Sequence, residues 1–186
     1  ALEAAARANP ESQTVVAHLD RLKPKPPPSD PIERLELRLA EELDDAERAD
    51  ILEKMAILWQ QRSQPDRARS CLEQALAADP TRASALSRLG QLLQRGGPPE
   101  ALADVLRRHI QLAAPQERVG LGHRLARLYE GPLADAEQAW AVYHGILSVD
   151  GSDRPALQAV ARLSEQRGDW QEHARALHAL ERGADS

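Results

Sequence analysis

Histidine and cysteine are the residues of this sequence that could most readily bind a metal or act as a nucleophile. His173 and His178 are five residues apart, about 140° around a helix, so their imidazoles would diverge instead of chelating one ion. Three others lie on separate predicted helices: His109, His123 and His144. Cys71 is the only cysteine, and its place on the inner side of a predicted helix favours a small packed apolar side chain. We therefore predict no metal site and no intramolecular disulfide.

Sequence motifs that mark common enzyme classes are absent as well. The chain contains no phosphate-binding loop pattern, no G-x-S-x-G and no H-E-x-x-H. We therefore predict a protein that is not an enzyme and needs no cofactor.

Composition indicates an all-α protein. Aromatic residues make up only 3% and Phe is absent, whereas the helix formers Ala, Leu, Arg, Glu and Gln dominate.

The formal net charge of −5 argues against a nucleic-acid-binding surface, which needs a basic excess on one face. No stretch approaches the roughly 20 apolar residues of a membrane span. The abundance of Ala and Arg over Lys suggests a GC-rich genome, and we expect a bacterial, cytoplasmic protein.

Apolar periodicity predicts helices separated by short breaks along the whole chain. Pro65 and Pro99 suit first turns, and Ser152 or Asp153, together with Asp169, suit N-caps. The predicted helices are 2–8, 12–22, 32–43, 46–62, 65–78, 82–95, 98–113, 116–130, 134–148, 153–167 and 169–182.

A proline-rich stretch interrupts this pattern near the N-terminus. Its sequence, "KPKPPPSDP", favours extended polyproline II over helix. We therefore predict a partial hairpin over 1–22, left from a preceding repeat, then a linker over 23–31 and a helical array over 32–186. The opening "ALEAAARANP" reads like the second half of a helical unit, so we expect a fragment of a larger protein.

The array is built on an internal repeat. Leu52 and Leu86 lie 34 residues apart, and so do Ala56 and Gly90. The same apolar face recurs around Ala126. A fourth copy includes Leu157, Val160, Ala161 and Ser164. A period near 34 residues with two helices per period predicts stacked helical hairpins, in which small residues allow close helix packing.

The unit 49–82 resembles a tetratricopeptide repeat (TPR). It carries a leucine, a bulky residue, a small residue and an aromatic in its first helix, two alanines around a bulky residue in its second, and a closing proline. These are Leu52, Met55, Ala56, Trp59, Ala68, Leu72, Ala75 and Pro80. Later units over 83–116, 119–152 and 154–186 match progressively less well, and the resemblance covers about three quarters of the chain. It implies a right-handed α-solenoid.

The family holds peptides or partner segments on a concave face lined by the first helix of each hairpin. Carried over to this sequence, the resemblance implies the groove-facing residues Glu53, Ile57, Gln60, Ser87, Gln91, Gln94, His123, Arg127, Glu130, Gln158, Arg162 and Glu165. Arginines among them favour an acidic or C-terminal peptide, because guanidinium groups bind carboxylates in a bidentate manner. The Lys and Asn that clamp a chaperone's terminal carboxylate in one subset of the family are missing, so chaperone binding is not predicted.

The function predicted from these residues is that of a non-catalytic scaffold or adaptor for a protein partner. Three alternatives stay open: a self-assembly module that stacks through its end helices, a helical-repeat RNA binder, and a regulatory domain of a larger protein. The last predicted helix is relevant to the first of these. It carries an apolar stripe that either packs onto the preceding unit or docks something else: Trp170, Ala174, Leu177 and Leu180.

Overall fold

The computed structural model describes residues 28–182, and this part of the chain is all-α. Its helices are α3 (Pro31–Leu39), α4 (Asp45–Gln61), α5 (Pro65–Ala78), α6 (Ala83–Gln94), α7 (Pro99–Leu112), α8 (Pro115–Glu130), α9 (Ala136–Val149), α10 (Arg154–Arg167) and α11 (Trp170–Arg182). No strand occurs within 28–182, which confirms the predicted fold class. The helices expected over 2–8 and 12–22, and most of the proline-rich stretch, lie outside the described residues.

The chain divides into two compact units, 1–42 and 43–186. Within the first unit, Asp30 caps α3 by accepting a hydrogen bond from the Ile32 amide at 2.9 Å. This helix was expected to reach residue 43 but ends at Leu39. The physical reason is local, because the amides of Ala40 and Glu41 bond to carbonyls three residues back and tighten the last turn.

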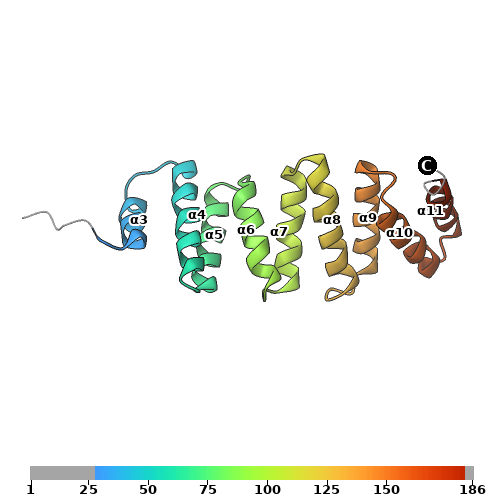
Figure 1. Cartoon of the computed structure of the whole chain (residues 1–186), viewed down its shortest axis with the longest axis horizontal. Helices are drawn as coiled ribbons and strands as arrows, with labels where there is room; N and C mark the ends of the chain where they lie inside the picture. Colours follow the sequence, from blue (N-terminus) through green and yellow to red (C-terminus); the bar gives the residue numbers. More distant parts are fainter. Residues whose placement is uncertain (1–27, 183–186) are drawn as a thin grey trace, which may run out of the picture. The chain divides into compact units, whose positions relative to one another are not determined.

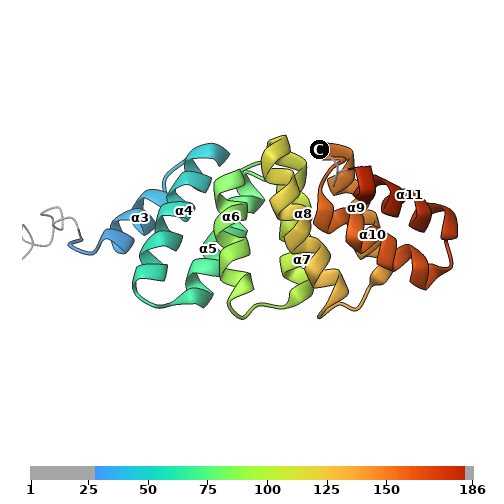
Figure 2. The ribbon, with the colours of Figure 1, turned by 45° about the vertical axis from the view of Figure 1, so that its right-hand side comes forward.

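The second unit is a series of helical hairpins, shown in Figures 1 and 2 from two directions. Helices α4 and α5 form the first hairpin, α6 and α7 the second, α8 and α9 the third, and α10 and α11 the fourth. Each hairpin also packs against the next through α5 and α6, α7 and α8, and α9 and α10. This is the arrangement that the repeat predicts, with a first and a second helix in every unit.

The helix ends follow the predicted punctuation. Pro65 and Pro99 each open a helix at its first position, where a missing amide hydrogen costs nothing. Asp153 caps α10 by accepting from the Ala156 amide at 2.8 Å, and Asp169 accepts from the Glu172 amide at 3.1 Å at the start of α11. Of the two predicted caps for α10, the structure therefore uses Asp153 and not Ser152.

Fully buried alanines recur along the helices of the array. The side chains with no exposed surface include those of Ala49, Ala56, Ala68, Ala75, Ala85, Ala126, Ala139 and Ala156. Leucines pack beside them, and Leu72 and Leu86 are also fully buried. Cys71 is buried among these residues, as its helical position predicts.

The last helix buries little of its predicted apolar stripe. Trp170 is 65% exposed and Leu177 is 43% exposed, whereas Ala176 is buried. His173 faces α10, with its Nδ1 2.8 Å from the Ala161 carbonyl oxygen. The helix is thus rotated so that Ala176 and His173, and not Trp170, meet the rest of the unit.

Two glycines on buried faces provide a matched test of how closely the helices approach. A Cβ atom at Gly90 would lie 3.7 Å from Val105 Cγ1, whereas at Gly122 it would lie 2.7 Å from Ile146 Cγ1. Gly90→Ala should therefore raise the free energy of unfolding by about 0.5–1 kcal/mol, because alanine is the better helix former. Gly122→Ala should lower it by about 1 kcal/mol, because overpacking outweighs that gain.

Urea denaturation of both variants beside the parent protein, followed by far-UV circular dichroism, measures this difference. Both variants make the same chemical change within a helix. Shifts of the same sign would show that helix propensity, and not the approach of α9 to Gly122, decides stability.

Candidate partner-binding surface

The predicted groove residues all lie on the first helices of the hairpins. Glu53, Ile57 and Gln60 are on α4, and Ser87, Gln91 and Gln94 are on α6. His123, Arg127 and Glu130 are on α8, and Gln158, Arg162 and Glu165 are on α10. We call the side of α4, α6, α8 and α10 that carries these residues the first-helix face. The structure separates them into residues bonded to the neighbouring hairpin and residues without such a bond.

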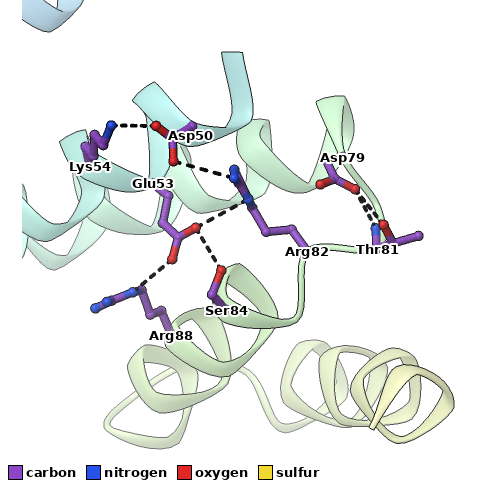
Figure 3. Close-up of polar contacts among 8 residues, drawn as sticks. All are labelled: Asp50, Glu53, Lys54, Asp79, Thr81, Arg82, Ser84 and Arg88. Atoms are coloured by element: carbon purple, nitrogen blue, oxygen red, sulfur yellow. Dashed lines mark hydrogen bonds and ion pairs between the residues drawn. The ribbon is translucent and has the colours of Figure 1, made fainter. Parts of the chain in front are cut away.

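Glu53 bridges the first and second hairpins (Figure 3). Its carboxylate accepts hydrogen bonds from Arg88 Nε at 3.1 Å and from Ser84 Oγ at 2.9 Å, and lies 3.5 Å from Arg82 Nε. The Glu53 side chain is only 13% exposed, so these contacts form in a partly dehydrated setting where charge pairing is stronger than in bulk water. Glu53 therefore holds α4 and α6 together.

Asp50, one turn before Glu53, contributes to the same cluster. It accepts a hydrogen bond from Lys54 Nζ at 2.5 Å and lies 3.5 Å from Arg82 Nη2. The hydrogen bond from Lys54 lowers the pKa of the Asp50 carboxyl, and Arg82 acts in the same direction. Figure 3 also shows Thr81 bonded to Asp79 in the turn that leads to Arg82.

Gln94 and His123 form the next bridges along the array. Arg124 Nη2 donates to Gln94 Oε1 at 2.7 Å, which joins α8 to α6. His123 Nε2 lies 3.0 Å from Asp153 Oδ2, and Asp153 is also the N-cap of α10. These two predicted residues therefore serve the contact between hairpins and are less available to a ligand.

Glu130 joins the third and fourth hairpins. It forms an ion pair with Arg162 and accepts a hydrogen bond from Tyr143 Oη at 3.2 Å. Burial of Tyr143, reinforced by the negative charge of Glu130, raises the pKa of the phenol to about 12. The phenol therefore stays protonated and donates to Glu130 throughout the physiological pH range.

These bridges share a spacing that sequence reasoning missed. The bonded partners are separated by 35 residues for Glu53 and Arg88, 30 for Gln94 and Arg124, and 32 for Glu130 and Arg162. Each separation is close to one repeat. Complementary polar residues recurring at the repeat period on first helices were the signal that could have revealed them.

The remaining predicted residues keep their side chains available. Gln91, Arg127 and Gln158 are exposed on α6, α8 and α10, and none has a hydrogen bond or ion pair within the described residues. Glu165 is exposed as well, whereas Ile57 and Gln60 are half-buried on α4. An exposed guanidinium can bind carboxylates, and exposed amide groups can bind peptide groups.

Ser87 lies in a cleft of about 530 Å³ between α6 and α8. Its lining consists of Ala83, Ser87, His109, Glu117, Gly120, Leu121 and Arg124. His109 comes from α7, a second helix, and was not predicted to join this surface. Burial lowers the pKa of His109, and the nearby positive charge of Arg124 adds to that effect while Glu117 opposes it.

Within residues 28–182, no group of three or more His, Cys, Asp or Glu side chains is placed to hold a metal ion. None of the described helices is both long and apolar enough to cross a bilayer. The first-helix face presents guanidinium, amide and carboxylate groups, which form hydrogen bonds and ion pairs.

Removing the charge of Glu53 should destabilise the array. Glu53→Gln leaves Arg88 without its carboxylate and removes one of the two carboxylates beside Arg82, which should lower the free energy of unfolding by about 1–2 kcal/mol. Glu73→Gln is the matched control, because its ion pair with Arg69 is half-exposed within one helix and should change stability by less than about 0.5 kcal/mol. Urea denaturation compares the two, and equal effects would contradict a special role for Glu53.

The depressed pKa of His109 predicts acid sensitivity. Below the ordinary histidine pKa of 6.5, unfolded His109 takes up a proton more readily than folded His109, so falling pH favours unfolding. His109→Gln removes this contribution and should make stability less dependent on pH between 7.5 and 5.0.

Urea denaturation at the two pH values measures the change for the parent, His109→Gln and the control His178→Gln, which removes an exposed imidazole from α11. The control should lose as much stability as the parent on acidification. If His109→Gln also does so, burial of His109 does not contribute to the pH dependence.

Comparison with known proteins links this geometry to a recognised architecture. No protein-family model matches the sequence, and a search of curated proteins found no match. Solved structures do match. A crystal structure of MamA has a TM-score of 0.51 at 20% identity, over 83% of this chain and 90% of MamA. A second MamA structure, designated AMB-1, has a TM-score of 0.54 at 18% identity, over 82% of this chain and 80% of that one.

A third similar structure is named for the repeat itself. It is a Podosopora anserina protein with nearly identical TPR-like repeats, with a TM-score of 0.50 at 18% identity, over 82% of this chain and 85% of that one. At these identities the likeness concerns the fold. Together with the hairpins α4 to α11, it confirms the resemblance noted in the sequence. The chain has the fold of a tetratricopeptide-like helical repeat protein.

Proposed function

We propose that this chain is a non-catalytic scaffold that binds a segment of a partner protein on its first-helix face. The observation that carries the proposal is the division of that face into two sets of residues. Glu53, Gln94, His123 and Glu130 are bonded to a neighbouring hairpin, whereas other side chains on the same helices have no such partner. The bonded set holds the helices in place, so the unbonded set is presented in a fixed arrangement.

The unbonded set indicates the chemistry of the partner. Arg127 is an exposed cation, and Gln91 and Gln158 offer amide donors and acceptors on the helices to either side. Arg162 is a weaker candidate, because Glu130 already neutralises it. An acidic segment in extended form would pair a carboxylate with Arg127 and its backbone groups with the two amides.

A second candidate function is self-association through α11. Trp170 and Leu177 are both large and exposed on this helix. Covering apolar side chains of this size with a partner surface is favourable, because it removes apolar area from water. Sedimentation velocity over a hundredfold range of concentration tests this alternative. A concentration-dependent dimer that Trp170→Ser abolishes would favour it.

Selection from a displayed library of random peptides tests the scaffold proposal without knowledge of the natural partner. The peptides that bind should be rich in Asp and Glu. Arg127→Glu should weaken them at least about tenfold, since a charge-assisted hydrogen bond contributes about 1.5–3 kcal/mol and 1.4 kcal/mol is a factor of ten.

Arg69→Glu makes the same charge change on the second helix α5 and serves as the control. Its affinity for the selected peptides should stay within about twofold of the parent. Peptides that bind all three proteins equally well would place recognition outside the first-helix face and contradict the proposal.

A further inference from the structure

A second cleft, separate from the first-helix face, is formed where the second helices α7 and α9 flank α8. It measures about 510 Å³, within the range of about 300–1,000 Å³ typical of small-molecule sites. Its lining consists of Arg107, Ile110, Gln111, Arg118, Gly122, Leu125, Val142, Gly145, Ile146, Ser148 and Val149. None of the predicted groove residues is among them.

Five of the eleven lining residues are branched aliphatic ones, and two more are glycines. Leu125 and Ile146 are buried at 2% and 3% exposure, and Ile110 and Val142 are half-buried. Gly145 adds no side chain, and a Cβ atom there would meet no atom within 4 Å. The cleft therefore offers branched aliphatic walls and unfilled space beside Gly145, which suits an apolar chain without bulky substituents.

Arg118 supplies a fixed cation at the cleft. Its Nε donates a hydrogen bond to the Ala113 carbonyl oxygen at 2.9 Å, which holds the guanidinium in place. Within residues 28–182 it has no ion pair, and no Asp or Glu lines the cleft. Arg107, the other cation, is paired with Asp104. One oriented guanidinium therefore remains with its terminal nitrogens available for an anion.

The polar groups of the lining are too few for a peptide. A bound peptide presents an amide and a carbonyl at every residue, and each needs a partner when it is removed from water. Apart from the arginines, Gln111 and Ser148 are the polar side chains of the lining, and the Ser148 hydroxyl already donates to the Gly145 carbonyl oxygen at 2.7 Å. A ligand with a single polar end matches this distribution better.

We propose that this cleft binds an aliphatic monocarboxylate, with the chain against Ile110, Val142 and Ile146 and the carboxylate on Arg118. The two ends of the site then favour different parts of the ligand. The apolar part favours burial of methylene groups. The guanidinium selects a negative head group and disfavours a positive one. The site is independent of the proposed partner-binding face, so failure of either proposal leaves the other standing.

The test uses sodium decanoate, below its micelle concentration, as the probe and decyltrimethylammonium as a control with the same chain and the opposite charge. Methyl-labelled protein is titrated and followed by carbon–proton NMR. Decanoate should cause saturable shifts at Ile110, Val142 and Ile146 with one ligand bound at this site. The cation should bind at least about tenfold more weakly.

Three variants locate the binding. Arg118→Gln should weaken decanoate at least about tenfold, because a charge-assisted hydrogen bond is lost. Gly145→Leu should abolish the saturable shifts by filling the cleft, and it should fold well because leucine is a better helix former than glycine. Arg175→Gln removes an exposed arginine from α11 and should leave the affinity unchanged.

Three results would overturn the proposal. One is the absence of saturable methyl shifts with decanoate. Another is equal affinity for the cation, which would show that Arg118 does not select the head group. The third is unchanged binding by Gly145→Leu when circular dichroism shows that this variant is folded, since decanoate would then bind elsewhere.

Discussion

Close packing through alanine is the constraint on which the rest of this structure depends. A helical hairpin cannot bury its apolar stripe alone, so each one must approach its neighbours. Ala56, Ala85, Ala126 and Ala156 have no exposed surface. Because their side chains are a single methyl group, the helices approach closely enough for larger residues such as Leu86 to fill the remaining space. Every surface feature follows from the helix positions that this packing sets.

Polar contacts between hairpins act on top of that packing. They join first helices to one another or to the loop that precedes them, through Glu53, Gln94, His123 and Glu130. Packing of apolar surfaces has little direction, whereas hydrogen bonds require particular distances and angles. The bridges therefore specify how far one hairpin is shifted along the next, and they use polar residues that a ligand could otherwise contact.

Helix α8 contributes residues to both clefts. Gly120 and Leu121 line the cleft toward α6, whereas Gly122 and Leu125 line the cleft toward α9. Glycine at 120 leaves open space where a side chain could extend, whereas glycine at 122 allows the close approach of Ile146 on α9. One helix thus separates a polar cleft containing His109 from an aliphatic cleft beside Arg118.

The sequence by itself determined the fold class, the hairpin order and most helix ends. Periodic apolar residues must be buried, and Pro65, Pro99 and Asp153 act through local backbone hydrogen bonding, so their effects can be read without a structure. The end of α3 at Leu39 was missed because the tightened last turn leaves no mark in the apolar pattern. The first-helix positions of the predicted groove residues were likewise readable from the repeat.

Only the tertiary structure decided which of those residues are available. Glu53 and Arg127 are both charged residues predicted to face the groove from a first helix. Glu53 is hydrogen-bonded to residues of the next hairpin, whereas Arg127 is not. The entry of His109 into the cleft beside Ser87, and the exposure of Trp170, also depend on how whole helices are rotated. Contacts of this kind join residues about 30 positions apart, and their geometry is set by packing between helices, which a pattern within one helix does not encode.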